Sequence, residues 1–263
     1  MSYVYSLCSS SKGNCTYIGN KNSGVLVDVG IGIRDFTRFL EIQSIALSSV
    51  KAIFITHEHT DHIKGLTTVL KKINVPIYAS RGTLEQLVYK NAVNGTADLN
   101  EINKRSVCID DIEIAAFQTP HDAAHSLGYR IETNQGKKIC VCTDLGHMTD
   151  EIYVNLKASD FILLESNYDE DMLHNGDYPY FLKNRISGND GHLSNENCSK
   201  TLVSLLQDGT SKFLLGHLSE NNNRPHLAYD TAINELQSIG AQVNKDFQLS
   251  VAAVKCNGDI FEV

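Results

Sequence analysis

The sequence predicts an α/β fold in the form of an αββα four-layer sandwich, in which two mixed β-sheets pack together and helices flank them. In both halves of the chain, runs of strand-like sequence come first and alternating strand and helix patterns follow. A simple parallel doubly wound sheet would lack those initial runs of strands. No Gly/Ser-rich or Pro-rich linker and no repeat of roughly 20–50 residues divides the chain, so we expect one domain, residues 1–263.

The first half of the chain combines short apolar runs with amphipathic segments. The apolar run 52–55 is bounded by polar sequence, as a fully buried strand would be. Phe36, Phe39 and Leu40 fall on one face of a helix. In this half we expect strands at 3–7, 16–18, 25–27, 52–55 and 76–79, and helices at 34–46, 63–73 and 83–89.

The second half repeats this order of elements. Cys140 and Cys142 alternate with apolar residues on one expected strand, so we expect them to be core residues on the same face rather than metal ligands. Residues 166–194 form a longer polar excursion. In this half we expect strands at 107–109, 112–117, 128–132, 138–142, 161–165, 213–215, 248–254 and 260–262, and helices at 150–156, 195–206 and 226–238.

The formal charge at pH 7 is −8, from 23 Lys and Arg against 31 Asp and Glu. A protein whose affinity rests on a broad basic face is therefore not expected, because neutralising many phosphates requires many cations. An enzyme acting on nucleic acid remains compatible with this charge, because bound metal ions and a local patch can hold a phosphodiester.

The cysteines and the distribution of apolar residues indicate in which cellular compartment the protein is expected. The seven cysteines are odd in number and form no C-x-x-C pair, so we expect reduced, mostly buried thiols, as in cytosolic proteins. No run approaches the roughly 18 apolar residues of a membrane-spanning helix, and the N-terminus lacks the pattern of a secretory signal. We expect a cytoplasmic protein with no membrane association.

The strongest chemical motif is His57-x-His59-x-Asp61-His62, which follows the expected strand 52–55. The strand anchors this loop, so His57 and His59 can point to one side while Asp61 and His62 reach a second position nearby. Imidazole nitrogens suit Zn, Fe or Mn, and a carboxylate adds an oxygen ligand. The motif therefore predicts a metal site, and a polar loop with hydrogen-bonded histidines is the alternative.

Four further polar residues each come just after an expected strand: Asp28, His121, Asp144 and His217. Strand ends at one edge of a sheet converge in space, so we expect these side chains to meet the histidine loop. Singly, each has an alternative role as a capping or surface residue. Together they predict more than one metal position.

In this order, these residues resemble the five metal motifs of the metallo-β-lactamase-fold hydrolases, and the match covers essentially the whole chain. Other stretches resemble more narrowly the YycJ/WalJ-like branch, bacterial proteins regarded as DNA exonucleases. They are Ser9-Ser10-Ser11-Lys12-Gly13-Asn14-Cys15, His121-Asp122-Ala123-Ala124 followed by Gly128-Tyr129-Arg130, Glu165-Ser166-Asn167, Gly191-His192-Leu193-Ser194-Asn195 and Gly216-His217-Leu218-Ser219.

The resemblance implies two divalent metal ions, and His and Asp ligands leave Zn, Mn and Fe open. Asp28 would orient a loop ligand by a hydrogen bond instead of binding metal. The implied ligands are His57, His59, His121 and Asp144 for metal 1, and Asp61, His62, Asp144 and His217 for metal 2.

We expect Asp61 and His192 to take part in catalysis. Two metals about 3.5–4 Å apart would hold a bridging hydroxide that attacks phosphorus in line, and the leaving oxygen then needs a proton or a positive charge. His192 lies just before helix 195–206, whose N-terminus offers N–H groups to a phosphate. The alternative is a simple N-cap at Ser194 or Asn195 with His192 incidental.

The remaining histidines are expected to lie outside the site. His125 stands where the branch carries Asp, and we expect a surface or loop-bracing residue, with a spare ligand or substrate contact as the alternative. His147, His174 and His226 belong to no motif, and we expect them to be surface or structural residues.

The predicted function is that of a dinuclear metal-dependent phosphodiesterase, and the resemblance implies a DNA exonuclease acting from 5′ to 3′. The first alternative is a thioesterase, or a phosphodiesterase for small molecules or cyclic nucleotides, on the same metal site. A non-catalytic metal-binding or nucleic-acid-binding module is the third possibility. Complete ligand sets and the lack of an RNP-like string or a helix-turn-helix signature disfavour it. The sequence leaves the metal identity, DNA against RNA, and the oligomeric state open.

Overall fold

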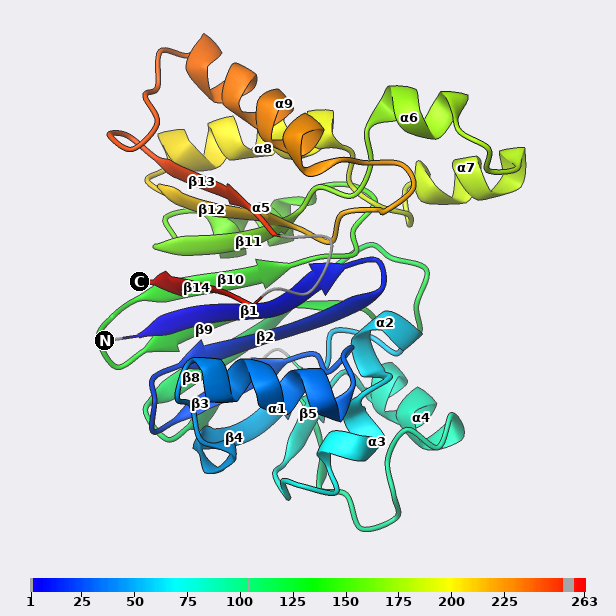
Figure 1. Cartoon of the computed structure of the whole chain (residues 1–263), viewed down its shortest axis with the longest axis vertical. Helices are drawn as coiled ribbons and strands as arrows, with labels where there is room; N and C mark the ends of the chain where they lie inside the picture. The colour runs from blue at the N-terminus through cyan, green and yellow to red at the C-terminus, as the bar shows by residue number, and fades with distance from the viewer. Residues whose placement is uncertain (1, 104, 253–257) are drawn as a thin grey trace.

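Two seven-stranded sheets face each other in the computed structural model, which describes residues 2–103, 105–252 and 258–263. Helices cover the outer face of each sheet, which gives the four layers seen in Figure 1. The predicted αββα sandwich with two mixed sheets is confirmed.

The first sheet contains the N-terminal strands and the C-terminal strand. Its β14, β1, β2 and β3 pair antiparallel, whereas β3 to β6 pair parallel. Its strands in spatial order are β14 (Asp259–Glu262), β1 (Tyr3–Ser10), β2 (Gly13–Gly19), β3 (Gly24–Val27), β4 (Val50–Phe54), β5 (Ile77–Ala79) and β6 (Leu99–Glu101). The helical elements connected to it are α1 (Ile33–Ile42), the 3-10 helix η1 (Leu47–Ser49), α2 (Thr60–Ile63), α3 (Leu66–Val69) and α4 (Arg81–Tyr89).

The second sheet has the same mixed character. Its β13 to β10 pair parallel and β10 to β7 pair antiparallel. Its strands in spatial order are β13 (Gln248–Val251), β12 (Lys212–Gly216), β11 (Phe161–Glu165), β10 (Lys138–Cys142), β9 (Leu127–Thr133), β8 (Ile112–Gln118) and β7 (Val107–Ile109). The helices on its side are α5 (Asp150–Leu156), α6 (Glu170–Asn175), α7 (Tyr180–Ile186), α8 (Asn195–Gln207) and α9 (Pro225–Ser238).

Strands in the centre of each sheet are buried on both faces. In β10, Ile139 and Val141 pack between the two sheets, whereas Cys140 and Cys142 pack in the apolar layer beneath the helices of the second sheet. The prediction that both cysteines are core residues on one face is confirmed. This double burial explains why these strands read as continuous apolar runs.

The parallel strands present their carboxyl ends at one edge of the sandwich, and unusual backbone conformations follow directly. Asp28, Asp144 and His217 come just after β3, β10 and β12, and their φ angles are 62°, 60° and 55°. Left-handed backbone is uncommon outside glycine and costs on the order of 1–3 kcal/mol per residue. Strain at three strand ends of one edge indicates a functional site there.

The structure differs from the expected local structure at four places. The helix expected at 63–73 is broken into α2, which already begins at Thr60, and α3. The Gly65 N–H donates to the Val29 carbonyl and the His62 carbonyl accepts from the Val29 N–H, so neither group is left for a continuous helix. Helix α1 ends at Ile42 rather than 46, because Ser44 turns into left-handed backbone (φ 55°). The excursion 166–194 contains helices α6 and α7, and strand β6 lies where none was expected. Part of the strand expected at 248–254 falls outside the described residues.

The thiol prediction holds for five cysteines, which are free: Cys15, Cys108, Cys140, Cys142 and Cys198. Of these, only Cys108 is exposed. It is wrong for Cys8, which is disulfide-bonded, and Cys256 lies outside the described residues.

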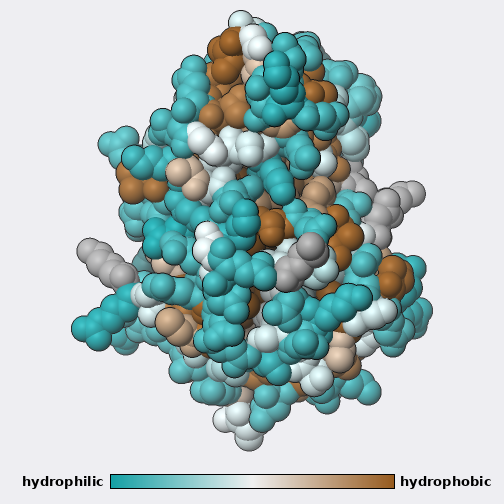
Figure 2. Space-filling view, turned by 90° about the vertical axis from the view of Figure 1, so that its left-hand side faces the viewer, coloured by the Kyte–Doolittle hydropathy of each residue, from teal (hydrophilic) through white to brown (hydrophobic). Residues whose placement is uncertain are grey.

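The surface shows no membrane-spanning element among the described helices, since none is long and apolar enough to cross a bilayer. The face opposite α6 and α7 is mostly hydrophilic, with small, separate hydrophobic patches (Figure 2).

Candidate metal centre

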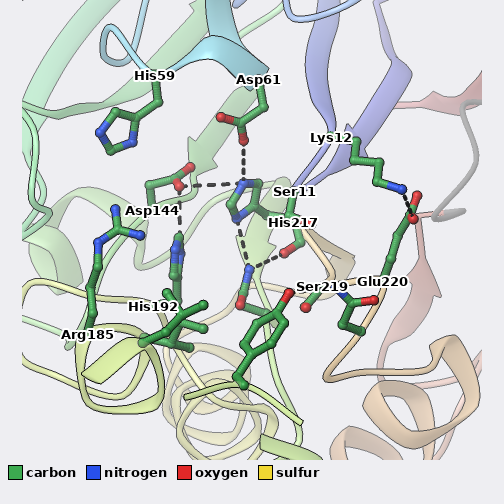
Figure 3. A pocket seen from close by; sticks show the side chains of 15 residues that line it. Ser11, Lys12, His59, Asp61, Asp144, Arg185, His192, His217, Ser219 and Glu220 are labelled. Atoms are coloured by element: carbon green, nitrogen blue, oxygen red, sulfur yellow. Dashed lines mark hydrogen bonds and ion pairs between the residues drawn. The ribbon is translucent and has the colours of Figure 1, made fainter. Parts of the chain in front are cut away.

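A pocket of about 370 Å³ opens at the edge where the parallel strands end. His59, Asp61, Asp144, His192 and His217 line it and converge from both sheets, as Figure 3 shows. The structure therefore brings strand-end residues that are far apart in sequence into one place.

The histidine loop is supported from behind by Asp28. One carboxylate oxygen, Oδ1, accepts a hydrogen bond from the Thr56 backbone N–H at 2.8 Å, and Oδ2 lies 2.7 Å from Nδ1 of His62. The Thr56 hydroxyl also donates to this carboxylate and lies 3.1 Å from Nδ1 of His57. Asp28 thus holds the loop and orients His62 so that its Nε2 points away, into the site.

One ligand group consists of His57, His59 and His121, whose ring nitrogens lie within 4.8 Å of one another. Nδ1 of His121 donates to the Gly191 carbonyl at 2.9 Å, so its Nε2 carries the lone pair, 3.3 Å from Nδ1 of His59. Burial lowers the pKa of both His57 and His59, and neighbouring histidines lower it further. Neutral imidazoles with free lone pairs are the form that binds a metal ion.

A second ligand group consists of Asp61, His62 and His217. Oδ2 of Asp61 lies 3.2 Å from Nε2 of His217 and 3.4 Å from Nε2 of His62. Asn14, on β2, lies 3.1 Å from the same nitrogen of His62 and borders this group. The sequence motif Ser9–Cys15 thus contributes Asn14 to the surroundings of this group.

Asp144 lies between the two groups. Its Oδ1 is 3.6 Å from Nε2 of His121 and 3.5 Å from Nε2 of His217, and its Oδ2 is 3.2 Å from Nε2 of His62. Its side chain is buried. One carboxylate therefore faces histidines of both groups.

The carboxylates around the second group favour a positive charge at its histidines. Burial alone would lower the pKa of His217, yet Asp144, Asp61 and Glu165 raise it to about 10. Burial likewise opposes the charge on Asp144, but His217 and His62 hold its pKa well below the usual range. Without a metal, a proton must fill this role, and a divalent ion would replace it.

Two buried atoms test the fit of a metal directly. Nε2 of His57 and Oδ2 of Asp144 have no hydrogen-bond partner among the described residues. A buried polar atom without a partner costs about 1–3 kcal/mol, so native structures rarely keep one without a reason. Both atoms belong to the ligand groups, and divalent ions would satisfy both.

Glu165 is the functional residue that sequence reasoning missed as a site residue. Its Oε1 lies 2.7 Å from Nδ1 of His217 and 2.8 Å from Nδ1 of His192, and its Oε2 accepts from the backbone N–H groups of Leu145 and Leu193. The side chain is fully buried at the end of β11. An acidic residue ending a buried strand, as Asp28 and Asp144 nearly do, was the available signal.

His192 lines the pocket between His121 of the first ligand group and His217 of the second. Its ring centroid is 5.1 Å from that of His121 and 5.4 Å from that of His217. Because a carboxylate only accepts hydrogen bonds, Nδ1 of His192 donates to Glu165, and Nε2 is left for a group in the pocket. Ser194 caps α8, because its side chain accepts a hydrogen bond from the Asn197 N–H. The turn therefore caps the helix and also places His192 in the pocket lining.

The other histidines lie away from the ligand groups. His125 is exposed, and its backbone carbonyl accepts a hydrogen bond from Ser80. Nδ1 of His147 lies 3.0 Å from the Asn189 carbonyl at an exposed position. His174 and His226 are also exposed.

Comparison with known families gives one clear match. A sequence model described as the beta-lactamase superfamily domain matches residues 24–217, which contain Asp28 and every candidate ligand from His57 to His217.

Two characterised relatives match over most of their length. The chain is 31% identical over 246 residues to exodeoxyribonuclease YycJ of Bacillus anthracis, covering 92% of each protein. It is 33% identical over 247 residues to exodeoxyribonuclease WalJ of Streptococcus pneumoniae, covering 92% of this chain and 91% of that protein.

Solved structures share the fold at low sequence identity. Zn(2+)-bound PqqB from Methylobacterium extorquens superimposes with a TM-score of 0.71 at 16% identity, over 99% of this chain and all of that one. The metallo-beta-lactamase fold protein YhfI from Bacillus subtilis gives 0.70 at 14% identity over the whole of both chains. These similarities support the architecture alone.

Proposed function

The chain belongs to the beta-lactamase superfamily, in its metallo-β-lactamase fold, and on that premise we propose that it is a dinuclear metal-dependent phosphodiesterase that degrades DNA as an exonuclease, from the 5′ end. The observation that supports two metals is Asp144, whose carboxylate faces histidines of both ligand groups. The support for DNA is the near full-length relationship to two exodeoxyribonucleases.

The donor sets support one assignment of ligands to two ions. His57, His59 and His121 would hold one ion, Asp61, His62 and His217 the other, and Asp144 both. Imidazole nitrogens and carboxylate oxygens are ligands of Zn, Mn and Fe alike, so the donor sets leave the metal identity to measurement. When bound, such ions supply Lewis acidity and a bound water of lowered pKa.

The protein's own residues prepare this site in three ways. Asp28 fixes the ring of His62, and the Gly191 carbonyl fixes that of His121, so each presents Nε2 to the site. Glu165 does the same for His217. Preset ligand orientation lowers the ordering cost of binding an ion and of binding a phosphate against it.

His192 is placed to act on the leaving group. Its Nδ1 donates to Glu165 at 2.8 Å, which fixes the ring with Nε2 toward the pocket. Nε2 could then donate a proton to the departing sugar oxygen, which a deoxyribose leaving group requires. Asp61, partly open to the pocket, is the second residue in reach of a substrate.

The test is a comparison of substrates on metal-loaded protein. End-labelled duplex DNA, a simple phosphodiester and a thioester are incubated with Mn²⁺ and, separately, with Zn²⁺. Stepwise release of nucleotides from the 5′-labelled end supports the proposal. Rapid thioester cleavage with intact DNA would replace it with a thioesterase, and stepwise loss from the 3′ end would reverse the polarity.

A further inference from the structure

The pocket has a polar wall and a wall that combines apolar and aromatic side chains with one arginine. The polar wall comes from the β1–β2 turn and the loop after β12, with Ser11, Lys12, Ser219 and Glu220. The other comes from residues 169–187, which include α6 and α7 and are here called the arm. Figure 1 shows the arm projecting beside the strand ends, and Figure 3 shows Arg185 across the pocket from Lys12.

The arm is built as a firm support. Leu173 and Ile186 form a small hydrophobic cluster with Tyr168, and Tyr178 and Leu182 pack against it. The Tyr178 hydroxyl accepts a hydrogen bond from Asn221 at 2.6 Å, which ties the arm to the polar wall. These contacts account for the inner, pocket-lining face of α7.

Helix α7 also exposes two large aromatic side chains that these contacts do not use. Tyr180 is 79% exposed and Phe181 is 73% exposed. Phe181 precedes Arg185 by four residues, so both lie on the same side of α7, and Arg185 lines the pocket. An exposed aromatic ring at the rim of an active site is the kind of feature that binds a partner.

The charged residues of α7 near Phe181 are basic, which favours a partner that carries negative charge. Helix α7 carries Lys183 and Arg185 and no acidic residue, and the acidic residues of the arm lie earlier, between 169 and 177. Asp122 holds the Arg185 guanidinium in a fixed plane through bonds of 2.5 and 3.0 Å. An exposed aromatic ring one helical turn from a planar guanidinium suits a nucleobase and its phosphate better than an apolar protein surface.

We propose that Phe181 and Arg185 form a stacking platform for an unpaired base next to the scissile phosphate, so that the enzyme engages single-stranded DNA ends. This rests on the proposed function, because it names the form of substrate for the same site. The backbone of the strand would follow the polar wall, where Lys12 pairs with Glu220, and its bases would face the arm.

The chain contains no tryptophan, which allows a direct probe. In Phe181→Trp, titration with a short oligothymidylate in EDTA should quench the indole fluorescence by stacking, over the concentration range in which a labelled copy binds by anisotropy. Ile42→Trp on α1, at a position 62% exposed and at the end of the helix away from the strand ends, is the matched control and should not respond.

A second pair of variants separates stacking from apolar contact. Phe181→Leu keeps an apolar side chain but loses the aromatic face, and should weaken oligothymidylate binding about tenfold, as expected for one base–aromatic stack. Phe181→Tyr should bind as the wild type does, and a blunt duplex should bind more weakly than the single strand.

The outcomes distinguish this inference from the function beneath it. Binding by anisotropy with no quenching in Phe181→Trp, or unchanged affinity in Phe181→Leu, overturns the stacking platform and leaves the nuclease proposal standing. If the indole fluorescence of Phe181→Trp falls with rising protein concentration in the absence of DNA, the exposed ring binds a second copy of the chain, and the stacking platform is overturned. Quenching by DNA in a protein that hydrolyses none supports the platform and overturns the nuclease proposal.

Discussion

Oδ2 of Asp28 lies 2.7 Å from Nδ1 of His62, and Nε2 of the same ring lies 3.2 Å from Asp144. One histidine thus links a buried supporting carboxylate, held in left-handed backbone at φ 62°, to the carboxylate between the two ligand groups. The support is built into the end of β3 and does not depend on a metal to place it.

Asp28→Asn should therefore weaken metal binding without unfolding the protein. The amide keeps the shape of the side chain but loses its charge, and loss of such a support typically costs about 10–100-fold in metal affinity. Isothermal titration with Mn²⁺ measures the change. Asp110→Asn is the matched control, since Asp110 is also left-handed (φ 48°) but lies in an exposed turn. Equal affinity in Asp28→Asn and the wild type would contradict this role.

Asp144→Ala should remove metal from both positions. We expect about two ions per chain in the wild type by elemental analysis and a sharp drop in the variant, because both ions lose a ligand. Asp111→Ala, at an exposed site, should keep the full complement. Unchanged metal content in Asp144→Ala would rule out the dinuclear assignment.

Metal uptake should release protons and strengthen with pH. The pKa of His217 is raised to about 10 in the metal-free protein, so its ion pairs with Asp144 and Asp61 are fully present below about 6.5 and are lost as pH rises through 10. A metal ion must displace this proton, so affinity should rise by up to about tenfold per pH unit in that interval. Calorimetry at pH 7 in two buffers of different ionisation enthalpy gives the proton count. Binding with no proton release would show that His217 is already neutral.

The site residues at the strand ends could be predicted because the sequence shows two signals there. An apolar run indicates the strand, and a polar residue follows it directly. Asp28, Asp144 and His217 were found in this way, and the structure places them together. Glu165 also ends an apolar strand. Its role as a site residue becomes recognisable only from its contacts with His192 and His217, which come from other segments of the chain.

Features that depend on close tertiary approach were not predictable. The break between α2 and α3 arises from hydrogen bonds of Gly65 and His62 to Val29, which lies in a separate segment. The arm was missed because α6 and α7 have six and seven residues, too few to show a helical period.

Gly30→Ala should destabilise the fold and displace the metal loop together. A Cβ at Gly30 would lie 1.7 Å from the Asp61 carbonyl, so the backbone next to two candidate ligands must move. Overpacking of this kind costs about 1–3 kcal/mol, and we expect a melting temperature lower by several degrees and a reduced metal content. Gly95→Ala, where a Cβ meets nothing within 4 Å, should change neither. A variant that melts as the wild type does and keeps its metal would show that the loop relaxes freely.

His192→Ala separates proton donation from phosphate positioning. His192 is in neither of the two ligand groups proposed to hold the ions, although its ring lies near Asp144, Glu165 and His217. We therefore expect the variant to fold and to keep both metals, which elemental analysis of the variant checks. Its rate on DNA should fall by about 10²–10⁴, the usual contribution of a general acid. The loss should be much smaller for a nitrophenyl phosphodiester, whose leaving group needs little protonation. His226→Ala, an exposed histidine on α9, controls for loss of a histidine in general. Equal losses on both substrates would assign His192 to holding the phosphate, and full activity on DNA would leave it a residue of the turn before α8.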